Sequence, residues 1–213
     1  MLHEAIGSAT TFLCSQRDPD GWWRDFDTLA GPSDEWVTAY TAYVLAHVNA
    51  APATEAARDA FHLLEARRRP IAWGYNHTVP SDADTTLWVI HLAQTLGMGK
   101  SAKIQRAERF LARHLSPDGG ISTYAHDRRI RLFTQLQLDV SFDGWCGSHT
   151  DVSALAARLV YVPYREALLA FLCASQRADG SWIGYWWCDD ECATALGIHA
   201  LASSELSEHN ERV

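Results

Sequence analysis

The sequence predicts an all-α fold, an α/α toroid of about four helical hairpins. Three observations carry this prediction: a repeat of about fifty residues, a series of stretches with helical spacing of apolar residues, and a tryptophan-containing turn motif that ends several of those stretches. The chain has 213 residues, of which 47% are hydrophobic and 21% are charged. One globular domain over residues 1–213 is therefore expected.

The turn motif marks the repeat. Gln176, Asp179, Gly180 and Trp182 follow the form Gln-x-x-Asp-Gly-x-Trp, and residues 16–23 match this form with one inserted residue. Degenerate copies lie at 69–75 and 115–121, so the motif recurs at steps of about 53 residues. The repeats are predicted at 1–48, 53–96, 101–161 and 164–203, followed by a tail at 204–213.

Each repeat is predicted to form an outer helix and then an inner helix. The outer helices have apolar residues three and four positions apart and end at Asp-Gly, Pro or Gly. They are expected at 2–15, 53–68, 101–115 and 164–176. The inner helices are more apolar around their circumference, because neighbouring helices surround them. They are expected at 34–48, 82–96, 149–161 and 189–203. An insertion at 120–147 alternates apolar and polar residues over 136–142, which favours a strand or an extended flap.

The charge and the apolar runs exclude several classes of protein. The formal net charge of −8 repels phosphate backbones, so nucleic-acid binding is not expected. Nowhere do eighteen apolar residues run together, and the first twenty residues lack the pattern of a signal peptide. We therefore expect no transmembrane segment and a cytoplasmic location.

The turn motif resembles the QW motif of squalene-hopene cyclases and related class II terpene cyclases. Their superfamily of α/α toroids includes the β-subunits of protein prenyltransferases. The resemblance implies that the Gln and Asp bond the ends of neighbouring helices and that the Trp stacks on them, so Trp23 and Trp182 are assigned to stability. The family toroid has six hairpins, whereas 213 residues suffice for about four. A smaller toroid, or an open one completed by a partner chain as in a homodimer, is expected.

Residues 80–85 read Pro-Ser-Asp-Ala-Asp-Thr and resemble the Asp-x-Asp-Asp-Thr motif of class II terpene cyclases. In that family the middle Asp protonates an alkene or epoxide. Two registers stay open. In one, Asp84 is the acid and Asp82 is its electrostatic partner; in the other, anchored on the Pro and the Thr, Ala83 occupies the acid's position. Capping of the helix, with Ser81 and Asp84 as a pair, is the alternative explanation for these residues.

Acidic and aromatic side chains gather at the predicted starts of all four inner helices. Inner helices of a toroid run parallel, so these starts are expected to converge on one mouth of a central cavity. Aromatic faces can stabilise a carbocation and shape an isoprenoid pocket. The candidate substrate-binding residues are Trp36, Trp73, Tyr75, Trp88 and Trp187, together with Asp34, Glu35, Asp151 and Asp190.

The favoured function is that of a small class II-type terpene cyclase, which cyclises an isoprenoid chain by proton initiation and needs no cofactor. Two alternatives stay open. A zinc-dependent prenyltransferase-like enzyme would hold Zn²⁺ through His149, Asp190 and Cys192, although the order of His and Cys is the reverse of the family's; a diphosphate substrate would call for Zn²⁺ or Mg²⁺. A non-catalytic toroid would use the same pocket to bind an isoprenoid or a partner.

Overall fold

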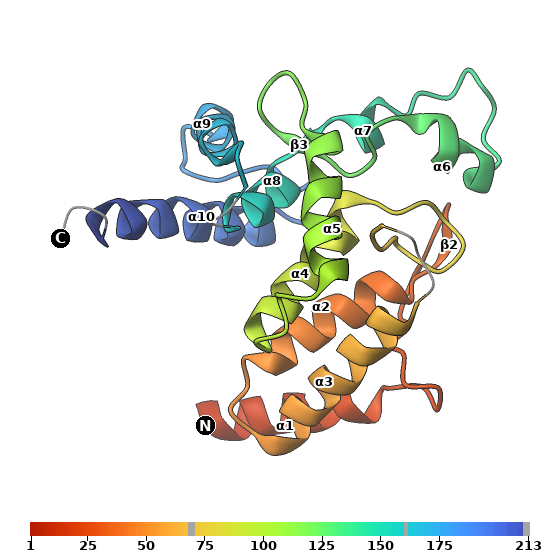
Figure 1. Ribbon diagram of the computed structural model, residues 1–213, viewed down its shortest axis with the longest axis vertical. Helices are drawn as coiled ribbons and strands as arrows, with labels where there is room; N and C mark the ends of the chain where they lie inside the picture. The colour runs from red at the N-terminus through yellow and green to blue at the C-terminus, as the bar shows by residue number, and fades with distance from the viewer. Residues whose placement is uncertain (68–70, 160–161, 211–213) are drawn as a thin grey trace. The chain divides into compact units, whose positions relative to one another are not determined.

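The computed structural model describes residues 1–67, 71–159 and 162–210, and it is mostly helical (Figure 1). The predicted all-α class is confirmed. The chain forms two compact units, one of residues 1–110 and 128–140, the other of residues 111–127 and 141–213.

The first unit holds two complete helical hairpins and most of a third outer helix. Its helices are α1 (Leu2–Ser15), α2 (Glu35–Ala46), α3 (Ala51–Ala66), α4 (Ala83–Thr95), nearly all of α5 (Ala102–Leu111) and of α6 (Asp127–Thr134). The short strands β1 (Asp27–Thr28) and β2 (Gly31–Pro32) pair antiparallel before α2. The inner helix α2 packs against both α3 and α4, and α1 packs against α3 (Figure 1).

The second unit contains the other inner helices. Its elements are the 3₁₀ helix η1 (Ala112–His114), β3 (Ile121–Ser122), α7 (Asp143–Cys146), β4 (Ser148–His149), α8 (Thr150–Ala157), α9 (Arg165–Ser175) and α10 (Glu191–Asn210). Strands β3 and β4 pair antiparallel, with Ile121 opposite His149. Helix α8 packs against both α9 and α10.

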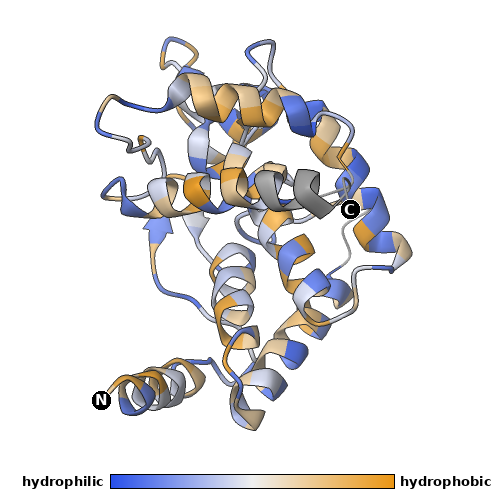
Figure 2. Cartoon of the chain, turned by 90° about the vertical axis from the view of Figure 1, so that its left-hand side faces the viewer, coloured by the Kyte–Doolittle hydropathy of each residue, from blue (hydrophilic) through white to orange (hydrophobic). Residues whose placement is uncertain are grey.

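Each expected helix has a counterpart in the structure. Helix α1 has the predicted bounds, and the inner helices begin one or two residues later than expected. The ends predicted for the helices at 53–68 and 149–161 lie outside the described residues. Helix α10 continues to Asn210 instead of ending at 203, so most of the expected tail is helical. Apolar residues also lie on the outside of α1, where Leu2 and Phe12 are 74% and 60% exposed (Figure 2).

The insertion at 120–147 contains β3 and two short helices, α6 and α7, joined by irregular segments. Of the strand or extended flap expected at 136–142, the strand is wrong. These residues form turns between α6 and α7. Leu138 is 88% exposed whereas Phe142 is 4% exposed, so the alternating apolar residues do not share a buried face. The guanidinium of Arg131 donates to the carbonyls of Gln137 and Val140, at 2.8 and 2.9 Å. These bonds occupy carbonyls that a strand would use for pairing.

A tryptophan clasp joins outer and inner helices in three of the four repeats. The indole N–H of Trp23, Trp73 or Trp182 donates to a carbonyl in the last two turns of α1, α3 or α9, at 2.7–2.8 Å. The last carbonyls of a helix have no N–H four residues later in the helix to bond them. Each clasp gives one of these carbonyls a hydrogen bond in addition to the one it accepts from Gln16, Arg67 or Ser175. Trp73 therefore takes the clasp position of its repeat and is fully buried. The structure gives it a structural role, and we do not retain it as a pocket residue.

A hydroxyl on each inner helix completes the clasp. Thr38, Thr86 and Thr194 accept a hydrogen bond from the backbone N–H of the clasp Trp and donate to its carbonyl. In the remaining repeat Ile121 replaces the Trp, and its N–H donates to Ser153 at 2.8 Å. These four hydroxyls mark the same position in each repeat, so residues of the four inner helices can be compared by counting from them.

The Asp-Gly pair of the motif forms the turn itself. The carboxylates of Asp20, Asp118 and Asp179 each accept the N–H two residues later, and the Gly after each Asp has φ of 87–88°. Such positive φ values favour glycine. The amide of Gln176 donates to the carbonyl of Gly180 in the same turn. Asp20, Asp179 and Gln176 thus make these bonds within the turn and not to the end of a neighbouring helix, which corrects the expectation for them. Asp118 in addition accepts from the Ser148 hydroxyl, just before α8, at 2.7 Å.

Candidate active site

The clasp hydroxyls define equivalent positions at the starts of the inner helices. Four residues before each hydroxyl stand Asp34, Asp82, His149 and Asp190. The first three are the N-cap residues of α2, α4 and α8. Two residues further along stand Trp36, Asp84, Asp151 and Cys192. The second of these two positions therefore carries two of the candidate acids, Asp84 and Asp151.

Asp82 caps α4 and is 1% exposed. One carboxylate oxygen accepts from the Thr85 N–H at 2.7 Å, and the other accepts from the Thr85 hydroxyl at 3.2 Å. The Ser81 hydroxyl instead donates to the Ala72 carbonyl, so the expected cap formed by Ser81 with Asp84 is wrong. Both oxygens of Asp82 are thus bonded to Thr85 within the first turn of α4.

Asp84 is half-buried in the first turn of α4. Its Oδ2 accepts a hydrogen bond from the indole N–H of Trp36 at 2.7 Å. Trp36 occupies the equivalent position on α2, so equivalent residues of two neighbouring inner helices meet here. Within the first unit, the starts of adjacent inner helices come together as predicted.

An aromatic wall adjoins Asp84. We define it as Phe26, Trp36, Tyr40, Tyr43 and Trp88. Trp36 stacks on Tyr40 with ring centroids 5.5 Å apart, and Trp88 contacts Tyr40 at 4.8 Å and Tyr43 at 5.3 Å. The edge of Phe26 meets Trp36 at 5.9 Å. Trp88 lies one turn after Asp84 on α4, so both residues are on the same face of that helix. The wall therefore begins on the face of α4 that carries Asp84.

The structure brings together two of the predicted aromatic residues and adds three. Trp36 and Trp88 belong to the wall as expected, although Trp88 is only 3% exposed. Sequence reasoning missed Phe26, Tyr40 and Tyr43. Tyr40 lies four residues after Trp36 on α2, and Tyr43 lies three residues after Tyr40. This helical spacing is the signal that could have found these two residues.

Tyr75 and Trp187 are half-buried loop residues outside the wall as defined. The Tyr75 hydroxyl donates to the Phe26 carbonyl at 3.2 Å, and its own carbonyl accepts from the N–H groups of Asp34 and Trp36. Tyr75 thus ties its loop to the start of α2. Trp187 lies on the loop that precedes α10.

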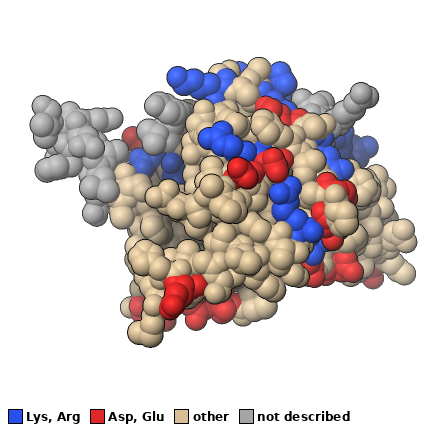
Figure 3. Space-filling view, turned by 90° about the horizontal axis from the view of Figure 1, so that it is seen from below, with Lys and Arg blue, Asp and Glu red and all other residues tan. Residues whose placement is uncertain are grey.

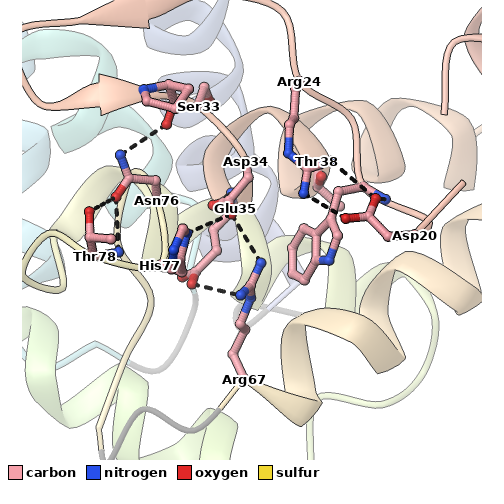
Figure 4. Close-up of polar contacts among 12 residues, drawn as sticks. Asp20, Arg24, Ser33, Asp34, Glu35, Thr38, Arg67, Asn76, His77 and Thr78 are labelled. Carbon is pink, nitrogen blue, oxygen red and sulfur yellow. Dashed lines mark hydrogen bonds and ion pairs between the residues drawn. The ribbon is translucent and has the colours of Figure 1, made fainter. Parts of the chain in front are cut away.

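Asp34 and Glu35 are engaged in an internal polar cluster (Figure 4). Arg67 contacts Asp34 at 3.0 Å and Glu35 at 3.6 Å, and His77 contacts Asp34 at 3.2 Å. Glu35 also accepts from the Gly74 N–H at 3.2 Å and is fully buried. These carboxylates hold the loop at 74–77 and the end of α3 against α2. We therefore assign both to the structure instead of to substrate binding.

Charged side chains of both signs mix on the surface. Figure 3 shows Lys and Arg next to Asp and Glu on the face that it presents. Arg24, for example, pairs with Asp18 at 2.5 Å and with Asp20 at 2.8 Å. In the parts of the chain that the structure describes, no helix is both long enough and apolar enough to cross a membrane.

A second polar network surrounds His149 in the other unit. Its Nδ1 lies 2.9 Å from the Thr123 hydroxyl and its Nε2 lies 2.7 Å from the Gly144 carbonyl. The indole N–H of Trp186, which sequence reasoning did not select, donates to the Thr123 hydroxyl at 2.8 Å. Burial lowers the pKa of His149 to about 4. The ring is therefore neutral at pH 7, with Nε2–H donating to the carbonyl and Nδ1 accepting from Thr123.

Asp151 is the buried acid of this unit, with 3% of its surface exposed. One oxygen accepts from the Val152 N–H at 2.9 Å. Burial raises the pKa of Asp151 to about 6, because a low-dielectric environment disfavours the charged form. Asp151 thus changes charge closer to neutral pH than an ordinary Asp.

The residues expected to hold zinc do not fit a zinc ion. Both ring nitrogens of His149 already make hydrogen bonds. Asp190 accepts from the Gly184 N–H at 2.9 Å and pairs with Arg177 at 2.6 Å. Among the described residues, no three His, Cys, Asp or Glu side chains form a group that could hold a metal. We derive no metal-dependent step.

Comparison with known proteins identifies the fold. No protein-family model matches the chain, and no curated protein sequence matches it. Among solved structures, the type II terpene cyclase MstE from Scytonema matches with a TM-score of 0.86 and 42% identity over 95% of this chain and 59% of MstE. A protein from Actinoplanes matches with a TM-score of 0.86 and 40% identity over 94% of this chain and 60% of that one.

Two MstE variants were solved with bound small molecules. One is in complex with geranylgeranyl dihydroxybenzoate, its substrate, and another with merosterolic acid A, its product; each matches with a TM-score of 0.88 and 42% identity over 96% of this chain. The chain spans about 60% of the length of MstE. It has a type II terpene cyclase-like fold, which confirms the expected class; the matches do not bear on squalene-hopene cyclase in particular.

Proposed function

We propose that this chain, with its type II terpene cyclase-like fold, cyclises an isoprenoid substrate by protonating an alkene. The observation that carries the proposal is the position of Asp84, a half-buried carboxyl at one end of the aromatic wall. The isoprenoid substrate bound to MstE supports the substrate class. The proposal concerns this chain as it stands, which spans about 60% of the length of MstE.

Asp84 is the proposed acid. In its neutral form it gives its proton to the terminal alkene: the O–H bond breaks, the π electrons form a new C–H bond, and a tertiary carbocation remains on the adjacent carbon. Internal alkenes then attack this cation in turn and close the rings. The last cation loses a proton from an adjacent carbon to solvent, which forms an alkene, and Asp84 takes up a proton from solvent. The wall faces of Trp36, Tyr40 and Trp88 stabilise the cation and keep water from it.

Asp82 is the proposed electrostatic partner. Thr85 donates a hydrogen bond to each of its two oxygens. Neither oxygen is therefore well placed to carry a proton to a substrate. A carboxylate two residues away disfavours a second negative charge, which keeps Asp84 protonated before the reaction. The geometry therefore supports the register in which Asp84, not Ala83, carries the chemistry.

The test is turnover of prenyl compounds by purified protein. Wild type, Asp84→Asn and Asp82→Asn are incubated with geranylgeranyl dihydroxybenzoate and with shorter prenyl analogues, and products are identified by mass spectrometry and NMR. We expect cyclic products from wild type and a loss of about 1,000-fold or more in Asp84→Asn, with substrate still bound. Equal turnover by Asp84→Asn would remove Asp84 from the acid's role.

Binding without turnover would favour the alternative function. If wild type and Asp84→Asn bind the prenyl compound equally and leave it unchanged, the chain is an isoprenoid-binding module. Circular dichroism of each variant checks that the fold is intact. Asp82→Asn is expected to lower stability as well as turnover, because an amide has only one acceptor oxygen and so loses one of the two hydrogen bonds from Thr85.

We also propose a homodimer, on the evidence of two exposed apolar stripes. The stripe on α1 consists of Leu2, Ala5, Ala9 and Phe12, and the stripe on α10 consists of Ala195, Ile198 and Ala202. Each has the spacing with which helices pack together. Light scattering during size-exclusion chromatography should give twice the chain mass, and Ile198→Glu should halve it. A monomer at every concentration would contradict the proposal. The cytoplasmic location also remains a prediction.

A further inference from the structure

We propose that Trp36 is a positioning residue for Asp84: its indole N–H holds Oδ2 as an acceptor, so that Oδ1 carries the proton that is transferred. The inference rests on the proposed function in one respect, the role of Asp84 as the acid. It adds to that function a second residue, from the neighbouring repeat, that acts on the acid.

The indole is held in place from several sides. Its ring stacks on Tyr40 with an interplanar angle of 15° and meets the edge of Phe26 at 75°. The backbone N–H of Trp36 donates to the Tyr75 carbonyl at 3.3 Å. These contacts leave the N–H directed at Asp84 Oδ2, 2.7 Å away. The donor is therefore oriented before any substrate binds.

The chemistry of the indole determines what the contact does. An indole nitrogen donates a hydrogen bond and cannot accept one. Asp84 Oδ2 is therefore an acceptor in both the neutral and the ionised carboxyl. In the neutral form the carbonyl oxygen is a stronger acceptor than the hydroxyl oxygen, so the bond from Trp36 favours the proton on Oδ1. The indole does not titrate, so it cannot take up the proton that Asp84 is to deliver.

The same bond stabilises the product of proton transfer. When Oδ1 loses its proton to the alkene, negative charge spreads over both oxygens, and the bond from Trp36 to Oδ2 becomes charge-assisted and stronger. A donor already aimed at developing charge lowers the barrier to the step. Trp36 thus makes Asp84 a better acid while Asp82 keeps it protonated at rest.

The discriminating variant is Trp36→Phe, which keeps an aromatic ring in the wall and removes the donor. The variant loses the hydrogen bond to Asp84, a group that becomes charged during the reaction. We therefore expect kcat to fall by about 10- to 100-fold, with KM changed less than about 3-fold. Without the donor, Asp84 keeps its proton to higher pH. The alkaline limb of the pH profile of kcat should therefore move to higher pH.

Trp88→Phe is the matched control, because Trp88 lies in the same wall and contacts Tyr40 and Tyr43 through its ring. A smaller ring there should change KM or the product pattern and leave the alkaline limb in place. A shift of the limb in Trp36→Phe alone therefore separates positioning of the acid from a general effect on the pocket.

A second readout does not need turnover. The carboxyl stretching band of Asp84, identified in the infrared spectrum as the band lost in Asp84→Asn, is titrated in wild type and in Trp36→Phe. We expect the band to persist to higher pH in Trp36→Phe. Absence of turnover in wild type would refute the proposed function and leave this titration to decide the contact. An unchanged titration, or an unchanged kcat with an unmoved alkaline limb, would overturn the role of Trp36.

Discussion

Replacing the clasp hydroxyl of α4 tests how the repeats are held together. Thr86 accepts from the Trp73 N–H at 3.2 Å and donates to the Trp73 carbonyl at 3.1 Å, and both residues are fully buried. Thr86→Val keeps the shape of the side chain and removes both bonds. The carbonyl keeps a partner, because it also accepts from the Asp82 N–H at 2.9 Å. The N–H of Trp73 loses the hydroxyl in a site that water does not reach.

The magnitude follows from these partners. A buried N–H without a partner costs about 1–3 kcal/mol, and the second bond adds about 0.5–1 kcal/mol. We therefore expect Thr86→Val to lower the free energy of unfolding by about 2–3 kcal/mol. Thr194→Val should cost less, because its bond to the Trp182 carbonyl is 3.5 Å long and the pair is only partly buried.

Urea unfolding followed by circular dichroism and tryptophan fluorescence measures this loss. Thr54→Val is the control, since Thr54 donates to the Ala50 carbonyl, which also accepts from the Thr54 N–H. No buried group loses its last bond there, and the expected change is below about 0.5 kcal/mol. If Thr86→Val shifts the unfolding midpoint no further than Thr54→Val, the clasp does not stabilise the chain as argued.

Three further predictions use the charges and turns. The pKa of Asp151 is raised to about 6, against 3.8 for the ordinary group, so folding favours its protonated form and stability falls as pH rises from about 4 through 6. Asp151→Asn should therefore be more stable than wild type at pH 8. An equal difference in stability between the two proteins at pH 4 and at pH 8 would contradict this. Arg67→Met should cost about 3 kcal/mol in urea unfolding, because it removes the guanidinium that pairs with two buried carboxylates. Arg24→Met, at an exposed pair, should change stability less. Gly119→Ala should lower the melting temperature more than Gly97→Ala. Both glycines have positive φ, but only at Gly119 would the new Cβ lie 2.9 Å from a backbone carbonyl oxygen of α9. Equal losses in melting temperature would count against that clash.

The helices could be predicted from the sequence because their signals are local. The spacing of apolar residues along 2–15 and the Asp-Gly turn after it are properties of neighbouring residues, and α1 has those bounds. The failed strand at 136–142 shows the limit of such signals. Alternation indicates a strand only when one face is buried and a partner strand is present, and here the side chain of Arg131 takes two of the carbonyls.

The site could be predicted only in part. Asp84 and Trp36 were both candidates, but as an acid and a pocket residue without a link between them. Their hydrogen bond joins residues 48 positions apart, and it depends on α2 and α4 packing with their first turns level. Asp34 and Glu35 looked like site acids for the same reason that Asp84 did, their place at a helix start. Contacts with distant Arg67 gave them a different role.

The sequence by itself determined the all-α class, the repeat and the position of nearly every repeat helix, and it offered Asp84 at the start of α4 as a candidate, because periodicity, capping and turn chemistry act between residues a few positions apart. Only the tertiary structure decided which acids bond inside the protein, which tryptophans clasp helices, and which indole faces Asp84. Those outcomes depend on long-range packing, where a difference of one helix position turns a side chain by about 100° and changes its partners.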